Sequence, residues 1–311
     1  MSLQRKVILD MDPGFGDALA LALALASPEV EVVAVTATGG NVTPRDASRN
    51  VQAIIEYLDP ARRPRIGQAL EDQILRTDAR QLNGPDGLCG ANLDVVELVN
   101  QHPALKVLGE EIRRAPYDVT VIATGPLTNI ASLLLAEPDI ASLIGHLIIA
   151  GGTVAKTGNA TAAAEFNFYC DAEAARNVLR SPVTKTLIPL DVSGQLVLGF
   201  EFLELVKQSK SRTASLLERI LPGAYRMSRQ WLGVEGIHIY DVMAVIAAIR
   251  PNLFTTTGMY GDVETVGELT QGACVVDRRP TSTERPNMDV AIEIETSAVE
   301  AYLYRLLENA P

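Results

Sequence analysis

Three aspartates open the chain within eight positions, directly after an apolar run. Asp10, Asp12 and Asp17 lie in the stretch VILDMDPGFGDALALALAL, around a Pro-Gly turn that precedes an Ala/Leu-rich helical pattern. Carboxylates gathered at the end of a buried strand repel one another and lose hydration, so the cluster predicts a bound cation. Ligands that are all oxygen favour a hard ion such as Ca²⁺ or Mg²⁺. The alternative is that one acid caps the helix while the others pair with arginine or water.

Strand-like runs alternate with helical patterns along most of the chain. Short Val/Ile-rich runs predict strands at 6–9, 31–36, 119–123, 147–150 and 186–190, and helical patterns cover 18–26, 44–58, 104–114, 129–136 and 172–179. A helical region at 200–240, strand-like runs from about 255 and a helix near 297–308 follow, with long loops at 62–91 and 276–288. The alternation predicts an α/β fold with a mainly parallel central sheet and helices on both faces, in a single domain over 1–311.

Ligands of such sheets bind beyond the carboxyl ends of the strands. The predicted strands are followed by Asp10, Asn41, Thr124 and Gly151. We therefore expect these residues to meet at one edge of the sheet, where they would form a polar site.

Composition limits the partners that the chain is expected to bind. Lys and Arg total 27 against 38 Asp and Glu, a net charge of −11, which disfavours nucleic acid and anionic membranes. The three cysteines are widely spaced, which predicts no disulfide framework and favours a reducing, cytoplasmic setting. No signal-peptide pattern precedes the first strand, and the longest apolar stretch, 18–26, is too short to span a bilayer. A small molecule is the expected partner.

Further motifs follow the opening aspartates in a fixed order. They are DMDPGFGDALAL, TATGGN, VIATGPLTNIA, AGGTVAKTGNATAAAEFNFYCDAEAA, PLDVSGQ and GELTQGACVVDRR. Together they cover residues 6 to about 300 and resemble the signature segments of the inosine-uridine-preferring nucleoside hydrolases. The resemblance implies a nucleoside hydrolase-like fold and a calcium-dependent enzyme of purine or pyrimidine salvage. Such an enzyme cleaves the N-glycosidic bond of a ribonucleoside or related N-riboside, and it assembles as a homo-dimer or homo-tetramer.

The same resemblance implies roles for individual residues. Asp12, Asp17 and Asp241 match ligands of the calcium ion, Thr124 matches a main-chain carbonyl ligand, and Asp10 matches a supporting residue. Asp12 is also the expected base toward a calcium-held water, in a reaction through an oxocarbenium-like transition state. Asn41 matches the active-site asparagine of the family and is expected to take part in catalysis. The substrate is expected to contact a set of amide, carboxylate and aromatic side chains: Asn159, Glu165, Phe166, Asn167 and Asp241. The alternatives are a turn residue for Asn159 and a capping residue for Asn167.

Two departures from the family pattern concern the reaction itself. Gly16 replaces the first of two adjacent acids, the one that in the family binds the ribose 2′-hydroxyl, so Gly16→Asp is expected to raise hydrolysis of ribonucleosides. Tyr240 replaces a histidine that protonates the leaving base, and tyrosine is a poorer acid at neutral pH. His238 is the alternative acid, although in an extended segment it would face away from Tyr240. Trp231, on the preceding helix, is a candidate to contact the base.

Other readings remain open at this stage. Asn83-Gly84 stands where the family has His-Gly in the first long loop, so the base that is accepted cannot be assigned. A catalytically weak or silent homologue that keeps the metal and ribose pocket is the main alternative, favoured by Gly16 and Tyr240. A phosphohydrolase of the haloacid dehalogenase type also opens on a strand and DxD, but Pro13-Gly14 does not match its pattern.

Overall fold

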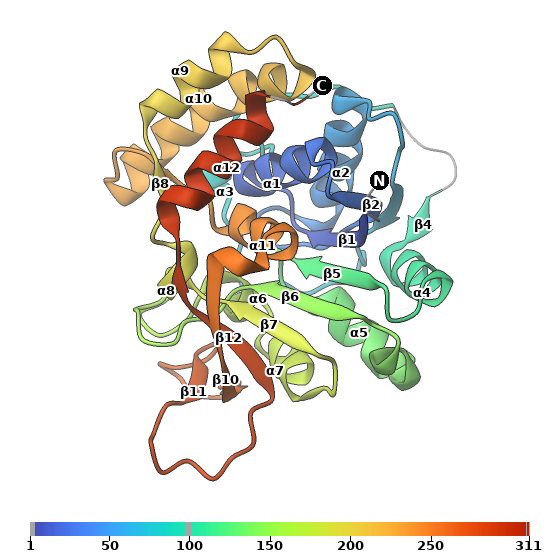
Figure 1. The fold of residues 1–311 in the computed structure, drawn as a ribbon, viewed down its shortest axis with the longest axis vertical. Coiled ribbons are helices and arrows are strands. Elements are labelled where there is room, and N and C mark those ends of the chain that lie inside the picture. Colours follow the sequence, from blue (N-terminus) through green and yellow to red (C-terminus); the bar gives the residue numbers. More distant parts are fainter. Residues whose placement is uncertain (1–3, 97–100, 309, 311) are drawn as a thin grey trace.

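The computed structural model describes residues 4–96, 101–308 and 310. A ten-stranded sheet crosses the molecule in the order β11-β10-β12-β7-β6-β5-β1-β2-β3-β4 (Figure 1). Neighbouring strands from β12 to β4 are parallel, whereas β10 is antiparallel to both β12 and β11. The predicted class, a mainly parallel α/β sheet with helices on both faces, is therefore confirmed.

The strands of the large sheet are β1 (Arg5–Met11), β2 (Val30–Ala37), β3 (Arg65–Gln68), β4 (His102–Pro103), β5 (Val119–Ala123), β6 (His146–Ala150), β7 (Lys185–Ile188), β10 (Phe254–Val263), β11 (Cys274–Asp277) and β12 (Met288–Ile294). A separate small sheet pairs β8 (Val197–Leu198) with β9 (Ile237–His238). The α-helices are α1 (Phe15–Ala26), α2 (Pro44–Leu58), α3 (Arg80–Asn83), α4 (Ala104–Arg114), α5 (Thr128–Ala136), α6 (Phe166–Cys170), α7 (Ala172–Arg180), α8 (Leu190–Ser193), α9 (Phe200–Gln208), α10 (Arg212–Leu232), α11 (Tyr240–Ile249) and α12 (Thr296–Glu308).

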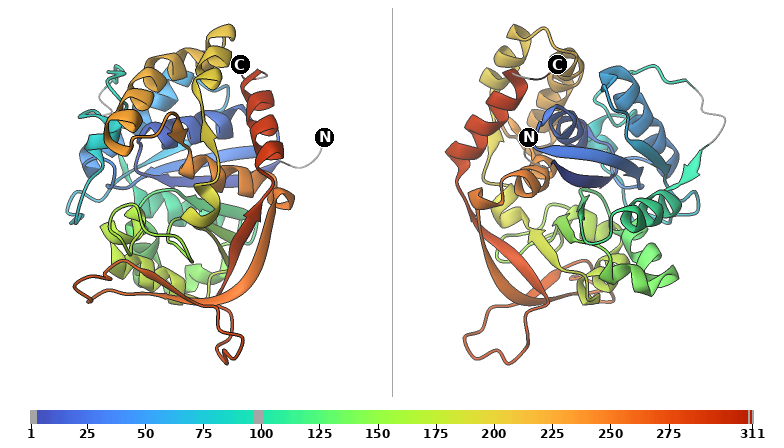
Figure 2. Two further views of the ribbon diagram at one scale, coloured as in Figure 1. Left: turned by 90° about the vertical axis from the view of Figure 1, so that its left-hand side faces the viewer. Right: turned by 45° about the vertical axis from the view of Figure 1, so that its right-hand side comes forward.

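Two hydrophobic cores lie on opposite faces of the sheet. Along β1, Val7 and Leu9 point into one core and Ile8 into the other, as the alternation of side chains along a strand requires. Helices α1, α2, α9, α10, α11 and α12 enclose the first core, and α4, α5 and α7 cover the second (Figures 1 and 2). None of the helices in the described part of the chain combines the length and apolar character needed to cross a bilayer.

Several predicted boundaries differ from the structure in ways that affect the site. Strand β1 continues to Met11, so Asp10 lies inside the strand, paired with Thr36, and does not follow the strand as expected. Helix α11 was not predicted, because its run VMAVIAAI is apolar on all sides and its N-terminus has no side-chain cap. Of the predicted long loops, 62–91 contains β3 and α3, whereas the segment between β11 and β12 projects from the molecule (Figure 2).

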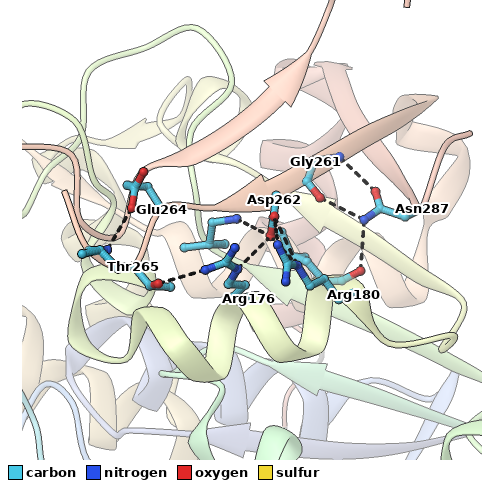
Figure 3. Close-up of polar contacts among 10 residues, drawn as sticks. Arg176, Arg180, Gly261, Asp262, Glu264, Thr265 and Asn287 are labelled. Atoms are coloured by element: carbon cyan, nitrogen blue, oxygen red, sulfur yellow. Dashed lines mark hydrogen bonds and ion pairs between the residues drawn. The ribbon is translucent and has the colours of Figure 1, made fainter. Parts of the chain in front are cut away.

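Polar contacts attach the C-terminal strands to α7 (Figure 3). The carboxylate of Asp262 on β10 accepts from Arg180 Nε at 3.1 Å and pairs with Arg176 Nε at 3.6 Å. Asn287 accepts from the main-chain N–H of Gly261 at 3.0 Å and donates to the carbonyls of Gly261 (2.9 Å) and Leu179 (3.1 Å). A single amide therefore joins the end of α7 to β10.

We predict that Asn287→Ala destabilises the protein, because these main-chain groups lose their partner. The expected loss is about 2 kcal/mol in the free energy of unfolding, measured by urea denaturation. Thr283→Ala, at an exposed position in the same loop, is the control and is expected to stay within about 0.5 kcal/mol of wild type. Equal effects of the two variants would show that the Asn287 contacts do not stabilise the fold.

Candidate active site

A pocket opens beyond the carboxyl ends of β1, β2, β5 and β6, and parts of α1, α10 and α11 close it from the side. Its polar lining residues are Asn41, Asn83, Thr124, Asn159, Glu165, Asn167, Ser193, Ser228, His238, Tyr240 and Asp241. Its apolar lining comprises Phe15, Gly16, Ala79, Leu82, Ala150, Gly151, Phe166, Leu190 and Leu232. This is the edge of the sheet at which the sequence predicted a ligand site.

Asp12 and Asp17 are buried beside this pocket, in contact with its lining residues Asn41 and Thr124. Asp12 directly follows β1, and its Oδ2 accepts from the main-chain N–H of Asn41 at 2.6 Å. Asp17 lies in the first turn of α1, where its Oδ1 accepts from Thr124 Oγ1 at 2.6 Å and its Oδ2 from the N–H of Gly14 at 3.2 Å. A carboxylate at this position also interacts favourably with the positive end of the helix dipole.

Asp241 reaches the same cluster from the first turn of α11. Desolvation and the charges of Asp17 and Glu165 raise its pKa. Desolvation and the charges of Asp17 and Asp241 likewise raise the pKa of Asp12 well above its ordinary value. The fold therefore brings Asp241 to two acids more than 220 positions earlier in the sequence, and the three repel one another.

The chemistry of this cluster fits a hard cation. Asp12 Oδ1 is buried and has no hydrogen-bond partner in the described part of the chain, so one carboxylate oxygen is left for a ligand. Within the described ranges, no three His, Cys, Asp or Glu side chains converge closely enough to enclose an ion by themselves. A cation here would thus need further oxygens, such as the carbonyl of Thr124, which accepts from Asn167 Nδ2 at 2.7 Å and has a second lone pair.

Asp10 lies beneath the cluster and makes different contacts. Its Oδ1 accepts from Thr36 Oγ1 at 2.6 Å and from Asn129 Nδ2 at 2.8 Å, and Asn129 also donates to the carbonyl of Ala37 at 2.8 Å. Burial raises the pKa of Asp10 to about 6. The side chain joins β1, β2 and α5 below the site, so any support that it gives to the acids above acts through the ends of these strands.

Asn41 is oriented by contacts at both ends of its side-chain amide. Nδ2 donates to the carbonyl of Asp12 at 3.0 Å and to Asp17 Oδ2 at 3.3 Å, and Oδ1 accepts from Asn83 Nδ2 at 2.9 Å. Asn83 Oδ1 in turn accepts from the N–H of Phe15 at 3.0 Å. Asn83, at the position where the sequence departs from the family His-Gly pair, therefore holds Asn41 in place.

Glu165 and Asn167 connect the pocket wall to the strand ends. The carboxylate of Glu165 caps α6 and accepts from the N–H groups of Gly152, Asn167 and Phe168 at 3.0, 3.0 and 3.1 Å. Burial raises the pKa of Glu165 to about 7. Asn167 Nδ2 donates to the carbonyls of Thr124 and Ala150, at 2.7 and 3.1 Å, which leaves its Oδ1 as the acceptor for a ligand.

Asn159 and Phe166 line the outer part of the same wall. Asn159 is exposed, and its Oδ1 accepts from the N–H of Phe166 at 2.8 Å. This hydrogen bond fixes the loop that begins at Gly151, which is the structural role expected of a turn residue. Asn159 also lines the pocket, as a sugar-binding residue would.

His238 and Tyr240 lie side by side, which corrects the expectation that His238 faces the other way, since side chains two positions apart in an extended segment share a face. Their rings stack at 5.1 Å between centroids with an interplanar angle of 8°. The expected extended segment ends at β9, and α11 begins at Tyr240, so the chain turns and brings both rings to the pocket. Burial raises the pKa of Tyr240 to about 12, whereas burial and the charge of Lys156 lower that of His238. Both groups are therefore neutral near pH 7.

Helix α10 contributes residues other than the one that was expected. Trp231 does not line the pocket, and its side chain is 52% exposed. Ser228 and Leu232 line the pocket instead. Residues four apart share a helix face, so the helical period could have paired these two positions, but nothing in the sequence indicates which face is turned toward the site.

Gly16 lies directly against Asp241, and this contact bears on the expectation for Gly16→Asp, which stays a prediction. A Cβ at position 16 would overlap Asp241 Oδ2. A side chain at position 16 therefore requires the Asp241 carboxylate, the free end of that side chain, to move aside.

Comparison with solved structures identifies nucleoside hydrolases with the same fold. A plant nucleoside hydrolase, PpNRh1, superimposes with a TM-score of 0.91 at 27% identity, over 99% of this chain and all of the other. An inosine-guanosine nucleoside hydrolase gives 0.88 at 27% identity, over 98% of this chain and 99% of the other. Fold and site thus define the class of the protein as an N-glycosyl hydrolase.

Comparison of sequences gives the family. Residues 7–301 match the model of the inosine-uridine preferring nucleoside hydrolases. The pyrimidine-specific ribonucleoside hydrolase RihA of Klebsiella pneumoniae is 34% identical over 299 residues, 94% of each chain. The non-specific ribonucleoside hydrolase RihC of Escherichia coli is 33% identical over 307 residues, 98% of each chain. The chain belongs to the inosine-uridine preferring nucleoside hydrolase family, as the motifs indicated.

We predict that Gly16→Ala weakens Ca²⁺ binding, because the added methyl group displaces the Asp241 carboxylate. The expected loss of affinity is about tenfold or more, measured by calorimetric titration. Gly258→Ala is the control, since a Cβ there meets nothing closer than Pro286 at 3.4 Å. Unchanged affinity in Gly16→Ala would show that the position of Asp241 does not govern metal binding.

We also predict that stability depends on pH in the absence of metal. The pKa of Glu165 is raised from 4.5 to about 7 and that of Asp10 from 3.8 to about 6, so the unfolded chain ionises first as the pH rises. Stability is therefore lost between about pH 4 and pH 7, by about 3 kcal/mol for Glu165 alone.

A bound cation favours the ionised acids and offsets part of this loss. Ca²⁺ should consequently raise the thermal midpoint more at about pH 8 than at about pH 5, relative to a chelator. Scanning calorimetry at the two pH values, with Ca²⁺ or with chelator, measures this difference. A calcium effect of equal size at both values would contradict the prediction.

Proposed function

We propose that this protein hydrolyses the N-glycosidic bond of a ribonucleoside or related N-riboside to free base and sugar. The observation that carries the proposal is the buried Asp12 Oδ1, which has no partner among the described residues, next to Asn41 of a pocket lined by amides, in a chain of this family. The names of the relatives, ribonucleoside hydrolases RihA and RihC, support the same class of substrate.

Asp12 is the proposed general base. The N–H of Asn41 holds Oδ2, which leaves Oδ1 as the atom that takes the proton from the attacking water. A Ca²⁺ ion would be held by Asp12, Asp17, Asp241 and the Thr124 carbonyl, and when bound it supplies positive charge that orients hydroxyls and acidifies water. That charge also favours the ionised form of Asp12, which a base requires.

The sugar is positioned by groups that are themselves fixed. Asn167 Oδ1 and the Glu165 carboxylate present acceptors whose orientation is set by main-chain contacts, and Asn41 and Asn159 lie at the inner and outer ends of the pocket. Fixed groups reduce the entropy that is lost on reaching the transition state. The surrounding carboxylates also stabilise positive charge that develops on the sugar.

Tyr240 and His238 are the proposed contacts to the leaving base. Each lines the pocket, and each is neutral, so the hydroxyl of Tyr240 donates a hydrogen bond while keeping its proton. The proposed cellular setting is nucleoside salvage in the cytoplasm, by a homo-dimer or homo-tetramer. Sedimentation at working concentration tests the assembly.

A second candidate is a weak or silent homologue that retains the pocket. Gly16 favours this reading, because it lacks the carboxylate found at that position in the family pattern. Such a protein would bind Ca²⁺ and ribose without releasing sugar from any nucleoside.

We predict that incubation with a panel of nucleosides and Ca²⁺ releases free ribose. Asp12→Asn should lower kcat by at least about 100-fold, because it removes the general base. Asp118→Asn is the control, since that carboxylate is exposed and pairs with Lys6 at the other end of the sheet. A reducing-sugar assay measures both variants. Calcium and ribose binding without ribose release by wild type would support the silent homologue instead.

A further inference from the structure

Lys156 brings a positive charge to the side of the pocket that His238 and Tyr240 form. The main-chain N–H groups of Val154, Ala155 and Lys156 donate to the carboxylate of Asp191, at 2.7, 2.7 and 3.0 Å. These bonds fix the segment against α8. Lys156 Nζ and Tyr240 Cε1 then lie 3.8 and 3.7 Å from the point that a Cβ on Gly194 would occupy.

The Lys156 ammonium has no hydrogen-bond or ion-pair partner among the residues that the structure describes, whereas Arg65 and Arg180, for example, are each paired with a carboxylate. Asp191 is the nearby acid, and the main-chain N–H groups occupy its oxygens. An unpaired cation beside a pocket in a chain of net charge −11 is a ready partner for a negatively charged ligand group.

Two neighbouring polar atoms also have no partner. His238 Nδ1 and Ser228 Oγ are buried, both side chains line the pocket, and neither atom has a hydrogen bond in the described structure. Buried polar atoms are ordinarily satisfied, so these two indicate a polar ligand edge. The charge of Lys156 reaches His238, since it contributes to lowering the pKa of that imidazole.

We infer that Lys156 stabilises the leaving base as an anion, while His238 and Ser228 hydrogen-bond to the edge of that base. The inference rests on the proposed function. When the bond between C1′ and the glycosidic nitrogen breaks, its electron pair stays on the nitrogen. The oxygen of water bonds to C1′ and its proton passes to Asp12, and the departing anion is later protonated by solvent.

The chemistry of this end of the pocket favours charge stabilisation over proton donation. Lys156 Nζ and the Tyr240 ring both border the position of a Gly194 Cβ, so the ammonium can stabilise negative charge beside them without transferring a proton. An ammonium on a flexible four-carbon side chain can follow the charge that forms on the base. Because Lys156 is exposed, water screens its charge, and its effect is smaller than that of a buried donor.

The test compares Lys156→Met with wild type on ribosides whose leaving groups differ in acidity. Xanthosine, inosine, uridine, adenosine and p-nitrophenyl riboside form the series. We expect kcat/KM to fall by roughly tenfold for the least acidic leaving groups, below the 10²–10³ of a buried donor. p-Nitrophenyl riboside, whose leaving group needs little stabilisation, should change by less than about twofold.

Two matched variants control for charge and structure. Lys156→Arg should retain the wild-type pattern, because it keeps the charge. Lys210→Met, an exposed lysine between α9 and α10, should leave every substrate unchanged. An equal loss on all substrates in Lys156→Met, or no loss, would overturn the inference. So would a wild-type preference for nucleoside 5′-monophosphates that Lys156→Met abolishes, since the charge would then serve a phosphate.

A binding measurement separates failure of this inference from failure of the proposed function. Absence of hydrolysis of any riboside, including the p-nitrophenyl one, overturns the proposed function alone. Calorimetric titration with xanthine, below and above the pH at which this base ionises, then tests Lys156 directly. Wild type should bind the anion more tightly than the neutral base, and Lys156→Met should lose that difference. Equal binding of the two forms by wild type overturns the inference.

Discussion

The rest of the site depends on the concentration of buried negative charge at the carboxyl edge of the sheet. Desolvation raises the pKa of Asp12, Asp17 and Asp241, and repulsion by neighbouring carboxylates adds to the rise for Asp12 and Asp241. Hydrogen bonds from Asn41 and Thr124 offset part of this cost. One oxygen of Asp12 remains without a donor, so the protein alone does not fully compensate the charge, and a cation is the natural complement.

The topology explains why such a cluster can be assembled at all. Parallel strands end at one edge, so the loops after β1, β2 and β5 deliver Asp12, Asn41 and Thr124 to the same place. Helices α1 and α11 begin there, and their N-termini bring Asp17 and Asp241 with a dipole that favours carboxylates. Hydrophobic side chains pack on both faces of the central strands, and this packing holds the strand ends, and the site residues that follow them, in fixed relative positions.

Local sequence patterns predicted helices and strands well where one clear feature, such as a helix cap or a short Val/Ile-rich run, marks the element. The Thr43 N-cap followed by Pro44 gave the start of α2 correctly, and the run 119–123 gave β5. Motif resemblance placed Asp241 beside Asp12, a proximity that no local pattern reveals. Side-chain direction was harder to predict: the facing of His238 depends on where β9 gives way to α11, and an apolar run with no cap does not mark that point.

The absence of a side chain at Gly16 determines where the neighbouring carboxylate of Asp241 can lie. Without a Cβ there, the Asp241 carboxylate can lie against α1. The carboxylates of Asp241 and Glu165 line the pocket, and the ammonium of Lys156, which has no partner among the described residues, lies beside it near Gly194 and Tyr240. Cleavage of an N-riboside separates charge in the same sense, positive on the sugar and negative on the base. Carboxylates near the sugar and an ammonium near the base therefore stabilise these two developing charges, and this lowers the energy of the transition state before any proton is transferred.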